Sequence, residues 1–458
     1  MLIVTIILGL VGLGVVVVVH EFGHFAAARA MGVEVEAFSV GWGPRIAGFK
    51  RGGTEWRFSA LPIGGYCKMK GEESFRKALE EKAPELPRDA GSFYGAAPWR
   101  RIVIALSGPL ANVLFALVVF MFVSTIGYSY PTYSNRIILL SEFNLGSPKL
   151  ASYPADAAGL KSGDRILSVD GKEVRDFSDL LEGITLSANK PVALKIERAG
   201  VLYDKTVTPM LNKETGGGLM GVSYWADPIV GEVDKGSAAQ IAGIVAGDRI
   251  VSIDGKSVRH AIEAQSILGA AKSERSKFVV ERDGKSFETN VILSWGAQGR
   301  SNLGLSYRTE THVITGVASV GAAIVAGIVE TRTTFNATLK GLGSLFMGVD
   351  LLKALSGPAR ITYMVGQSAT EGIQRSAQGG LALPLNFLAF LSISLFIMNL
   401  LPIPALDGGQ IAMFIVEGVR RRALRPITIY RYQTVGVVFI LAIFVFASIG
   451  DLIFFAAK

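Results

Sequence analysis

Residues 15–25 of the chain read VVVVVHEFGHF and contain two histidines, His20 and His24, separated by one helical turn. Residues four positions apart share one face of an α-helix, so both rings can direct a nitrogen at one metal ion. Two neutral imidazoles suit Zn²⁺, and a catalytic zinc normally takes a third protein ligand and a water. Glu21 lies beside the first histidine, where its carboxylate can take the proton of that water. The stretch therefore predicts a hydrolytic zinc site that still needs one ligand.

The motif closes an apolar run, because residues 2–19 contain no charged side chain. Ionisable groups at the end of a membrane span are costly to bury, so they are candidates for a functional site. The alternative is a chance match on a soluble amphipathic helix, and the apolar run argues against it. The N-terminus has no basic segment and no small-residue cleavage site, so we expect a retained span rather than a signal peptide.

The composition indicates a membrane protein with additional domains. The chain has 458 residues, half of them hydrophobic, and a formal net charge of +8. In a membrane protein this charge is typical of basic cytoplasmic loops, so we expect no nucleic-acid partner. The single cysteine, Cys67, excludes an intrachain disulfide and leaves the redox compartment open.

Hydropathy predicts four membrane spans, at residues 2–28, 102–126, 381–406 and 432–450. Five arginines lie between residues 420 and 431 without an acidic residue, and the loop from 29 to 101 is basic at both ends. Both segments are cytoplasmic if there are four spans and the N-terminus is outside. A fifth span at 313–329 would place one of them on the wrong side. We therefore expect 313–355 to be a helical region on the membrane surface.

The first loop predicts a small β-structure. Residues 52–71 alternate polar and apolar side chains with glycine and proline between them, which indicates a β-hairpin. A glycine-rich turn at 38–44 precedes it, and the charged segment 72–90 is expected to be a mobile surface segment. The hairpin could hold an extended substrate along its edge or be purely structural, and the sequence leaves both readings open.

The middle of the chain contains one unit twice. Residues 158–175 read AGLKSGDRILSVDGKEVR, and residues 242–259 read AGIVAGDRIVSIDGKSVR, a constant offset of 84 positions. Both units resemble PDZ domains of the bacterial type. Such a resemblance implies binding of extended peptides or chain ends in a groove, although a role as a steric spacer stays open.

The third predicted span offers the missing ligand. Its end reads NLLPIPALDGG at residues 399–409, and four spans bring Asp407 to the depth of the two histidines. The prolines disrupt helical hydrogen bonds, which a membrane protein tolerates where the backbone lines a cavity. Helix capping is the alternative role for Asp407. In the second span, the small residues of 107–112 (SGPLAN) allow close packing, and Asn112 can either hydrogen-bond across helices or simply pack.

The other two histidines, His260 and His312, lie in the middle region, far along the chain from the first motif. We interpret both as surface or core histidines rather than metal ligands.

Together, HEFGH, GPLAN, the tandem PDZ-like units, LSGPA at 355–359 and NxxPxPxLDGG closely resemble the site-2 protease family of M50-type intramembrane zinc metalloproteases. The order of the parts resembles RseP-type regulators of sigma-E. The resemblance implies zinc as the cofactor, with His20, His24 and Asp407 as its ligands and Glu21 as the catalytic base and acid. It also implies a substrate-binding cleft, formed by Asn399, Pro402, Pro404 and the hairpin residues Gly64 and Gly65.

The same resemblance implies the substrates and partners. Proteins of this family cut single-span membrane proteins, such as anti-sigma factors, after a first extracytoplasmic cut, and they also clear remnant signal peptides. Peptide ends at the PDZ-like units and the lipid bilayer would be further partners. We expect a monomer in the bacterial inner membrane, with the PDZ-like units extracytoplasmic and the active site towards the cytoplasm.

The expected fold is a polytopic α-helical membrane protein with a small cytoplasmic-side β-hairpin and two α+β PDZ domains. The expected parts are the first span (1–30), the cytoplasmic loop (31–100), the second span (101–128), the two PDZ units (129–212 and 213–310), the surface helical region (311–360), the third span (381–418), the basic loop (419–431) and the fourth span (432–456).

Two other functions are weaker. A zinc-containing membrane scaffold would close all four metal positions with protein ligands and would have no need of Glu21. A PDZ serine protease would need a nucleophile motif with a matched histidine and aspartate, and the sequence shows no Gly-x-Ser-x-Gly elbow.

Overall fold

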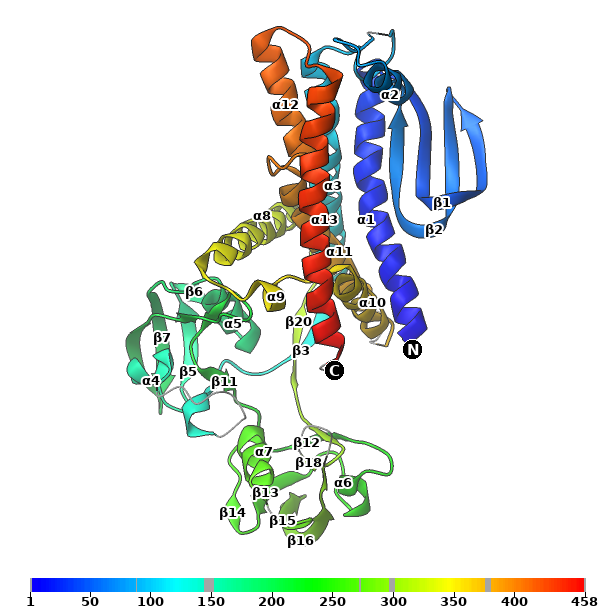
Figure 1. The fold of residues 1–458 in the computed structure, drawn as a ribbon. Coiled ribbons are helices and arrows are strands. Elements are labelled where there is room, and N and C mark those ends of the chain that lie inside the picture. The colour runs from blue at the N-terminus through cyan, green and yellow to red at the C-terminus, as the bar shows by residue number, and fades with distance from the viewer. Residues whose placement is uncertain are drawn as a thin grey trace. The chain divides into compact units, whose positions relative to one another are not determined.

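The computed structural model describes residues 2–87, 89–143, 152–271, 273–295, 301–374 and 380–456. The chain divides into a membrane unit, formed by residues 1–128, 314–346 and 350–458, and a second unit formed by residues 129–313 and 347–349. Within the described part, four helices are long and apolar enough to cross a membrane: α1 (Leu2–Ala30), α3 (Pro98–Ile126), α11 (Ala382–Asn399) and α13 (Pro426–Ala456). Helices α1 and α3 pack along each other (Figure 1).

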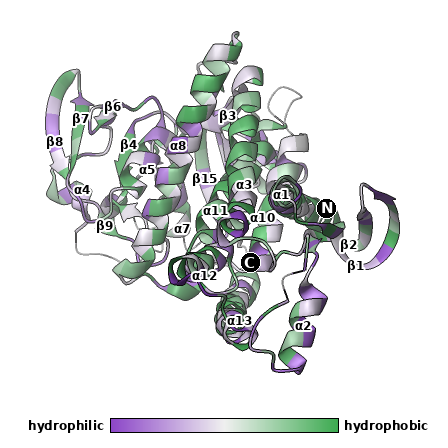
Figure 2. Cartoon of the chain, turned by 90° about the horizontal axis from the view of Figure 1, so that it is seen from above, coloured by the Kyte–Doolittle hydropathy of each residue, from purple (hydrophilic) through white to green (hydrophobic). Residues whose placement is uncertain are grey.

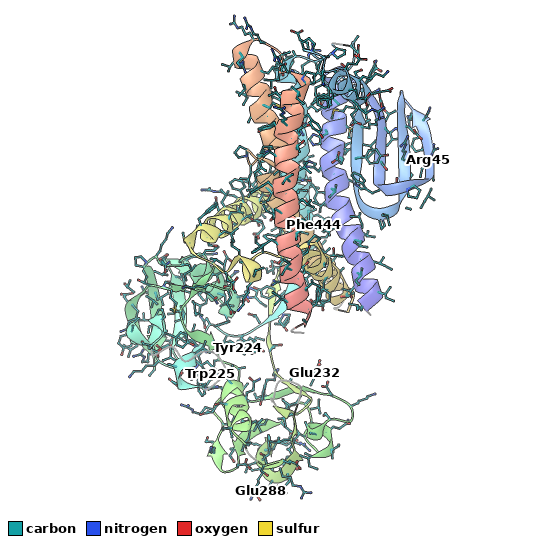
Figure 3. The ribbon with its side chains drawn as sticks, in the orientation of Figure 1. Arg45, Tyr224, Trp225, Glu232, Glu288 and Phe444 are labelled. Carbon is teal, nitrogen blue, oxygen red and sulfur yellow. The ribbon has the colours of Figure 1, made fainter. Side chains whose placement is uncertain are left out.

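The side chains of these helices explain why they form a membrane bundle. Hydrophobic residues run along α1 and α3 (Figure 2), so their outer faces offer apolar surface to lipid. On α13, Phe444 is half exposed and points away from the helix axis (Figure 3). Such exposed apolar side chains are stable in hydrocarbon and would be unfavourable over this length in water.

The surface helical region contains α8 (Val320–Ser344), η2 (Leu345–Met347) and α9 (Leu351–Ala354), and α10 (Pro358–Gln374) follows. Helix α8 packs against α3, and α10 packs against α1. In the described residues α8 is not among the helices that are apolar enough to span a membrane. Four membrane-capable helices agree with the four predicted spans.

A buried aspartate in α13 caps α10. Asp451 accepts hydrogen bonds from the backbone nitrogens of Gly357 (2.8 Å), Ala359 (2.9 Å) and Arg360 (3.1 Å). The first N–H groups of a helix have no intrahelical partner, so this carboxylate satisfies the start of α10 within the bundle. The acid in the last span therefore has a structural role, and it connects the LSGPA segment to α13.

We expect Asp451→Ala to lower the free energy of unfolding by about 1–3 kcal/mol, because the substitution leaves buried donors unsatisfied. Thermal unfolding of the purified protein in detergent measures this loss. Asp451→Asn keeps one acceptor oxygen and should lose less. An alanine variant as stable as the wild type would show that the cap contributes nothing.

The β-sheet that follows α1 is larger than the sequence predicts. Strand β1 (Val35–Arg51) pairs with β2 (Thr54–Met69), and the glycine-rich segment 38–44, predicted to be a turn, lies inside β1. Residues 37–40 pair with 65–68 on one side and with 55–58 on the other, so the hairpin folds back on itself. Gly41 and Gly43 have φ angles of 89° and 93°, which lets the strand bend there. Segment 65–69 forms one edge of this sheet.

The segment that follows the sheet is partly helical. Residues 72–90 are predicted to be a mobile surface segment, and they begin with α2 (Glu72–Glu80). Glu72 and Glu73 lie in its first turn and Lys77 in its last, an arrangement that favours a helix through its dipole.

The second unit repeats one architecture. The first copy contains α4 (Pro154–Ala157), β5 (Arg165–Val169), β6 (Lys172–Glu173), α5 (Phe177–Thr185), β7 (Val192–Arg198) and β8 (Val201–Val207). The second contains α6 (Ala238–Ile241), β13 (Arg249–Ile253), β14 (Lys256–Ser257), α7 (Ala261–Gly269), β15 (Arg275–Arg282) and β16 (Lys285–Ile292). Each copy has a four-stranded antiparallel sheet, in which the strands lie in the order β6-β5-β7-β8 in the first copy and β14-β13-β15-β16 in the second.

The repeated GDRI motif has a structural function in both copies. Asp164 is buried and accepts from Arg198 Nε at 2.6 Å, and Asp248 is buried and accepts from Arg282 Nε at 2.6 Å. Buried carboxylates require such partners. The aspartate of the motif therefore stabilises the fold of each copy, and it is not free to bind a ligand.

The boundary between the copies lies later than residue 212. Strand β11 (Val222–Tyr224) pairs with β4 (Ile137–Leu139), and Met220 lies in the core of the first copy. In the second copy β19 (Leu305–Tyr307) pairs with β12 (Val230–Val233). In each copy, a strand that follows the sheet in the sequence therefore completes the fold. No change in composition marks that strand in the sequence.

The remaining elements are short: β3 (Tyr128–Thr132) with β20 (Glu310–Ile314), β9 (Met210–Leu211) with β10 (Gly218–Leu219), β17 (Ser294–Trp295) with β18 (Ser301–Asn302), and η1 (Leu140–Glu142).

Candidate metal centre

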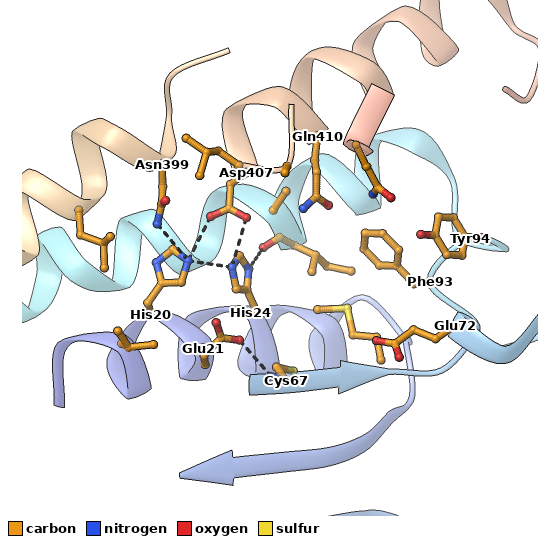
Figure 4. Close-up of a pocket in the computed structure, with 18 of the residues that line it drawn as sticks. His20, Glu21, His24, Cys67, Glu72, Phe93, Tyr94, Asn399, Asp407 and Gln410 are labelled. Atoms are coloured by element: carbon orange, nitrogen blue, oxygen red, sulfur yellow. Dashed lines mark hydrogen bonds and ion pairs between the residues drawn. The ribbon is translucent and has the colours of Figure 1, made fainter. Parts of the chain in front are cut away.

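Helix α1 brings the first two predicted ligands together in its C-terminal half. His20 Nε2 and His24 Nε2 lie 3.2 Å apart, as the spacing of one helical turn predicts. Both side chains are largely buried, with 8% and 12% of their surface exposed. Figure 4 shows the two rings projecting from α1 towards the same point.

The third predicted ligand, Asp407, lies in a separate helix, whereas the sequence predicts one continuous span there. The expected third span, 381–418, consists of α11, which ends at Asn399, and α12 (Asp407–Arg420). Pro402 and Pro404 interrupt the helix between them, since proline lacks the N–H that a helix needs. Ala405 has a φ of 78°, a conformation that costs about 1–3 kcal/mol and that is frequent beside functional sites. The break makes Asp407 the first residue of α12.

Asp407 closes a compact triad with the histidines. Its Oδ2 lies 3.1 Å from His20 Nε2, and its Oδ1 lies 3.5 Å from His24 Nε2. Donor atoms about 2.0–2.1 Å from a tetrahedral zinc lie about 3.3–3.4 Å from one another. The distances between donor atoms in the triad, 3.1 to 3.5 Å, therefore fit this ion without rearrangement. Two imidazoles and one carboxylate also match the donor set of a catalytic zinc with one position open.

Partners on α3 hold His24 in place. His24 Nδ1 lies 2.8 Å from the backbone oxygen of Ile104, which can only accept a hydrogen bond. Nδ1 therefore carries the proton, and Nε2 keeps a free lone pair that faces the triad. This is the tautomer that a metal ligand requires.

The far end of α12 is fixed by a buried ion pair. Arg101 of α3 donates from its Nη2 to Glu417 Oε1 at 2.6 Å, and its guanidinium lies 4.7 Å from the ring centre of Phe414. Both charges are buried, so breaking the pair would leave an uncompensated charge. The pair fixes the orientation of the helix whose first residue is Asp407.

Glu21 is positioned by the sheet of β1 and β2. Its Oε2 accepts a hydrogen bond from the backbone nitrogen of Cys67 at 3.0 Å, and Cys67 belongs to the edge segment 65–69 (Figure 4). Burial and the nearby Glu21 raise the pKa of the Cys67 thiol to about 12, so the thiol stays protonated at neutral pH. The sheet thus places the carboxylate of Glu21 next to the triad, and the thiol does not compete as a nucleophile.

The family model that describes peptidase family M50 matches residues 8–443, which is nearly the whole chain. The chain is a member of peptidase family M50. A zinc metalloprotease of Treponema pallidum is 40% identical over 451 residues, covering 98% of this chain and 99% of that protein. A second protein so named, from Borreliella burgdorferi, is 30% identical over 460 residues and covers 98% of both chains. The metalloprotease MmpA of Caulobacter vibrioides is 29% identical over 459 residues, 96% of this chain and 93% of that protein.

One solved structure, a PDZ domain of an SdrC-like protein from Listeria monocytogenes, is 21% identical and covers 19% of this chain and 90% of its own, with a TM-score of 0.17. The family and the relatives establish that this protein is a zinc metalloprotease of the site-2 protease family, as the sequence resemblance implied.

The M50 protease has a cavity of about 500 Å³ at the triad. Its walls include the three triad residues and Glu21, with Asn399 on one side and Tyr94 and Gln433 further away. Asn399 is the one predicted substrate-binding residue that lines it, and its Nδ2 lies 3.4 Å from His20 Nε2.

The other predicted substrate-binding residues lie outside the cavity wall. Gly64 and Gly65 lie in β2, against Val17 and Val18 of α1. Pro402 and Pro404 lie in the break between α11 and α12, where they determine the position of Asp407.

The histidines of the second unit do not take part in the triad. His260 is fully buried and caps α7 by accepting from the backbone nitrogen of Glu263, and burial lowers its pKa to about 4. His312 Nδ1 lies 2.8 Å from Asp176 Oδ2. Among the described residues, the metal-ligand cluster consists of His20, His24 and Asp407.

Sequence reasoning missed the residues that support the site. The backbone of Cys67 and the amide of Gln410 line the same cavity, and Gly108 lies directly against His24. The small residues of SGPLAN were the available signal, but they indicated close packing without naming the partner.

We expect Gly108→Ala to weaken zinc binding by about 10–100-fold, because a Cβ at this position would overlap His24 Nε2 and rotate the ring. Competition with a chromogenic chelator measures the zinc Kd. Gly341→Ala, at a helical glycine with open space around it, is the matched control and should bind zinc like the wild type. An unchanged Kd for the Gly108 variant would show that α3 does not position His24.

Proposed function

We propose that this M50 protease hydrolyses peptide bonds inside the membrane, in the transmembrane segments of single-span proteins. The observation that carries the proposal is the position of the triad, which lies between membrane-capable helices and not in a soluble domain. Ionisable side chains are costly to bury in such a bundle, so a site with two imidazoles, a carboxylate and an adjacent glutamate indicates a function there. The function that fits is hydrolysis of a bond that itself lies in the membrane.

The chain's own residues divide the chemistry between them. His20, His24 and Asp407 would hold zinc, which when bound acidifies water and polarises a carbonyl. Glu21 accepts the proton of the attacking water and delivers it to the amine of the leaving strand. Asn399 is close enough to the open side of the triad to bind a carbonyl of the substrate backbone. The cavity between these groups keeps the reacting bond apart from lipid.

The sheet would hold the substrate. A transmembrane helix must unwind before hydrolysis, because its carbonyls are hydrogen-bonded and shielded. Among the described residues, segment 65–69 pairs with another strand on one side only. An extended substrate can add along this edge, where the Cys67 N–H already donates to Glu21, and so recover backbone hydrogen bonds that it loses.

The topology extends the proposal to location and partners. The arginines between residues 420 and 431 favour a cytoplasmic loop. The triad would then lie towards the cytoplasmic side of a bacterial inner membrane, with the PDZ-like units outside. The substrates would be anti-sigma-factor-like proteins already trimmed by another protease, and remnant signal peptides. The PDZ-like units would exclude untrimmed substrates or bind their new ends, and the enzyme would work as a monomer in the bilayer.

Cleavage by purified protein in phospholipid nanodiscs tests the proposal. The substrates are two single-span proteins with identical spans, one with a short extracytoplasmic stub and one with a folded extracytoplasmic domain. We expect cleavage of the first only, loss of activity with a chelator and recovery with zinc. Equal cleavage of both would contradict the requirement for trimming, and resistance to chelators would contradict the metal mechanism.

A further inference from the structure

A buried amide on α3 faces Nδ1 of His20, the ring nitrogen that does not face Asp407. Asn112 is fully buried, and its amide nitrogen, as assigned, lies 3.2 Å from His20 Nδ1. Its Oδ1 is buried and has no hydrogen-bond partner among the described residues. A carboxamide that is buried in a membrane helix with half of its polar groups unused requires an explanation.

The chemistry of imidazole decides which way this amide must point. His20 Nε2 faces Asp407 and His24, so a metal bound there needs the lone pair of Nε2. A neutral imidazole then carries its proton on the other nitrogen, Nδ1, which becomes a donor. A donor needs an acceptor, and the amide nitrogen of Asn112 is not one. The oxygen and nitrogen of an asparagine amide are distinguished only by their hydrogen bonds.

His24 shows how the same requirement is met in its neighbour. Its Nδ1 faces the backbone oxygen of Ile104, an obligate acceptor on the same helix α3. A flip of the Asn112 amide would place its unpartnered oxygen opposite His20 Nδ1. Both ligands would then be held in one tautomer by acceptors from α3.

We propose that Asn112 is a positioning residue that accepts a hydrogen bond from His20 Nδ1–H through its Oδ1. The interaction fixes the tautomer and the ring orientation in which Nε2 is free for the metal. This inference rests on the proposed zinc function of the triad. It assigns to the last residue of SGPLAN a role that packing alone would not require.

Two variants separate this role from packing. Asn112→Leu has a similar volume and no hydrogen-bonding group, so we expect the zinc Kd to rise about 10–100-fold. Asn112→Asp offers only acceptors, and we expect it to bind zinc within a few-fold of the wild type. Competition with a chromogenic chelator gives the Kd, and the visible spectrum of the Co²⁺-substituted protein reports the ligand geometry. Thermal unfolding of the metal-free proteins compares their folding.

The pattern across variants tests the inference. If Asn112→Asp bound zinc as weakly as Asn112→Leu does, the amide would be a donor and the proposal would be overturned. Wild-type affinity in Asn112→Leu would overturn it too. Ser392→Ala, which removes another fully buried polar group from the bundle, is the control and should leave the Kd unchanged. Failure of the wild type to bind zinc would instead contradict the proposed function of the triad.

Discussion

Glu21→Gln is expected to slow peptide hydrolysis by a factor of about 10²–10⁴, the usual contribution of a positioned acid–base group. Glutamine keeps an oxygen that can accept from the backbone nitrogen of Cys67, so the local structure should persist. What it loses is the ability to take a proton from water and deliver it to the leaving amine. Because Glu21 is not part of the triad, the zinc content should stay at the wild-type level.

Single-turnover cleavage of a single-span substrate, together with metal analysis of the same preparation, measures both quantities. Glu36→Gln is a suitable control, because Glu36 lies in the same sheet and pairs with Lys68 at 2.8 Å on the exposed surface. We expect that variant to cleave normally. Normal cleavage by Glu21→Gln would refute its assignment as the base, and loss of zinc would assign it a structural role.

Asp407→Ala should remove both zinc and activity. The substitution deletes the one carboxylate that lies within 3.5 Å of both histidine Nε2 atoms. Two remaining imidazoles at i and i+4 would bind zinc more weakly than the complete triad. We expect the Kd to rise by more than about 100-fold, which is the upper end of the effect of losing an outer partner. Cleavage should fall to background at micromolar zinc.

The matched control for this change is Asp451→Ala, which removes a buried aspartate from the same bundle but from the cap of α10. That variant should be less stable and still bind zinc. Undiminished zinc content in Asp407→Ala would show that the third ligand lies elsewhere. Equal loss of zinc in both variants would show that the bundle, rather than the ligand, had failed.

The buried polar groups of the bundle have separate tasks. Asp451 caps α10, Arg101 and Glu417 join α3 to α12, and Asn112 lies against His20. Each has a partner on another helix, as the cost of burying polar atoms in a membrane demands. The triad differs because its donor atoms face one another and one cavity.

Much of this site could be predicted from the sequence, because the motifs that indicate it are short and lie within single helices. The i, i+4 spacing of His20 and His24 requires only a helix, and the apolar runs define the spans by length and composition. The four-span topology then brought Asp407 to the depth of the histidines, and the pairing of HEFGH with LDGG supported it as the third ligand. The constant offset of 84 residues revealed the repeat.

The features that were missed depend on long-range contacts. Segment 38–44 is predicted to be a turn because glycines usually break strands, whereas residues 38–40 pair on both sides and Trp42 pairs with Leu61, which keeps the segment within β1. The closing strand β11 carries no signal of its own and is defined by its partner β4. The predicted hydrogen bond of Asn112 across helices is present, but its partner, His20, could not be named, because the two residues are 92 positions apart and only the packing of α1 against α3 brings them together.

The position of the scissile bond tests the central claim most directly. Mass spectrometry of both fragments, after cleavage of a trimmed single-span substrate in nanodiscs, locates the cut to one residue. We predict a cut inside the apolar span, present with zinc and absent in Glu21→Gln. A cut in the polar flanking sequence, outside the span, would contradict an intramembrane protease and show that the site acts on segments in water.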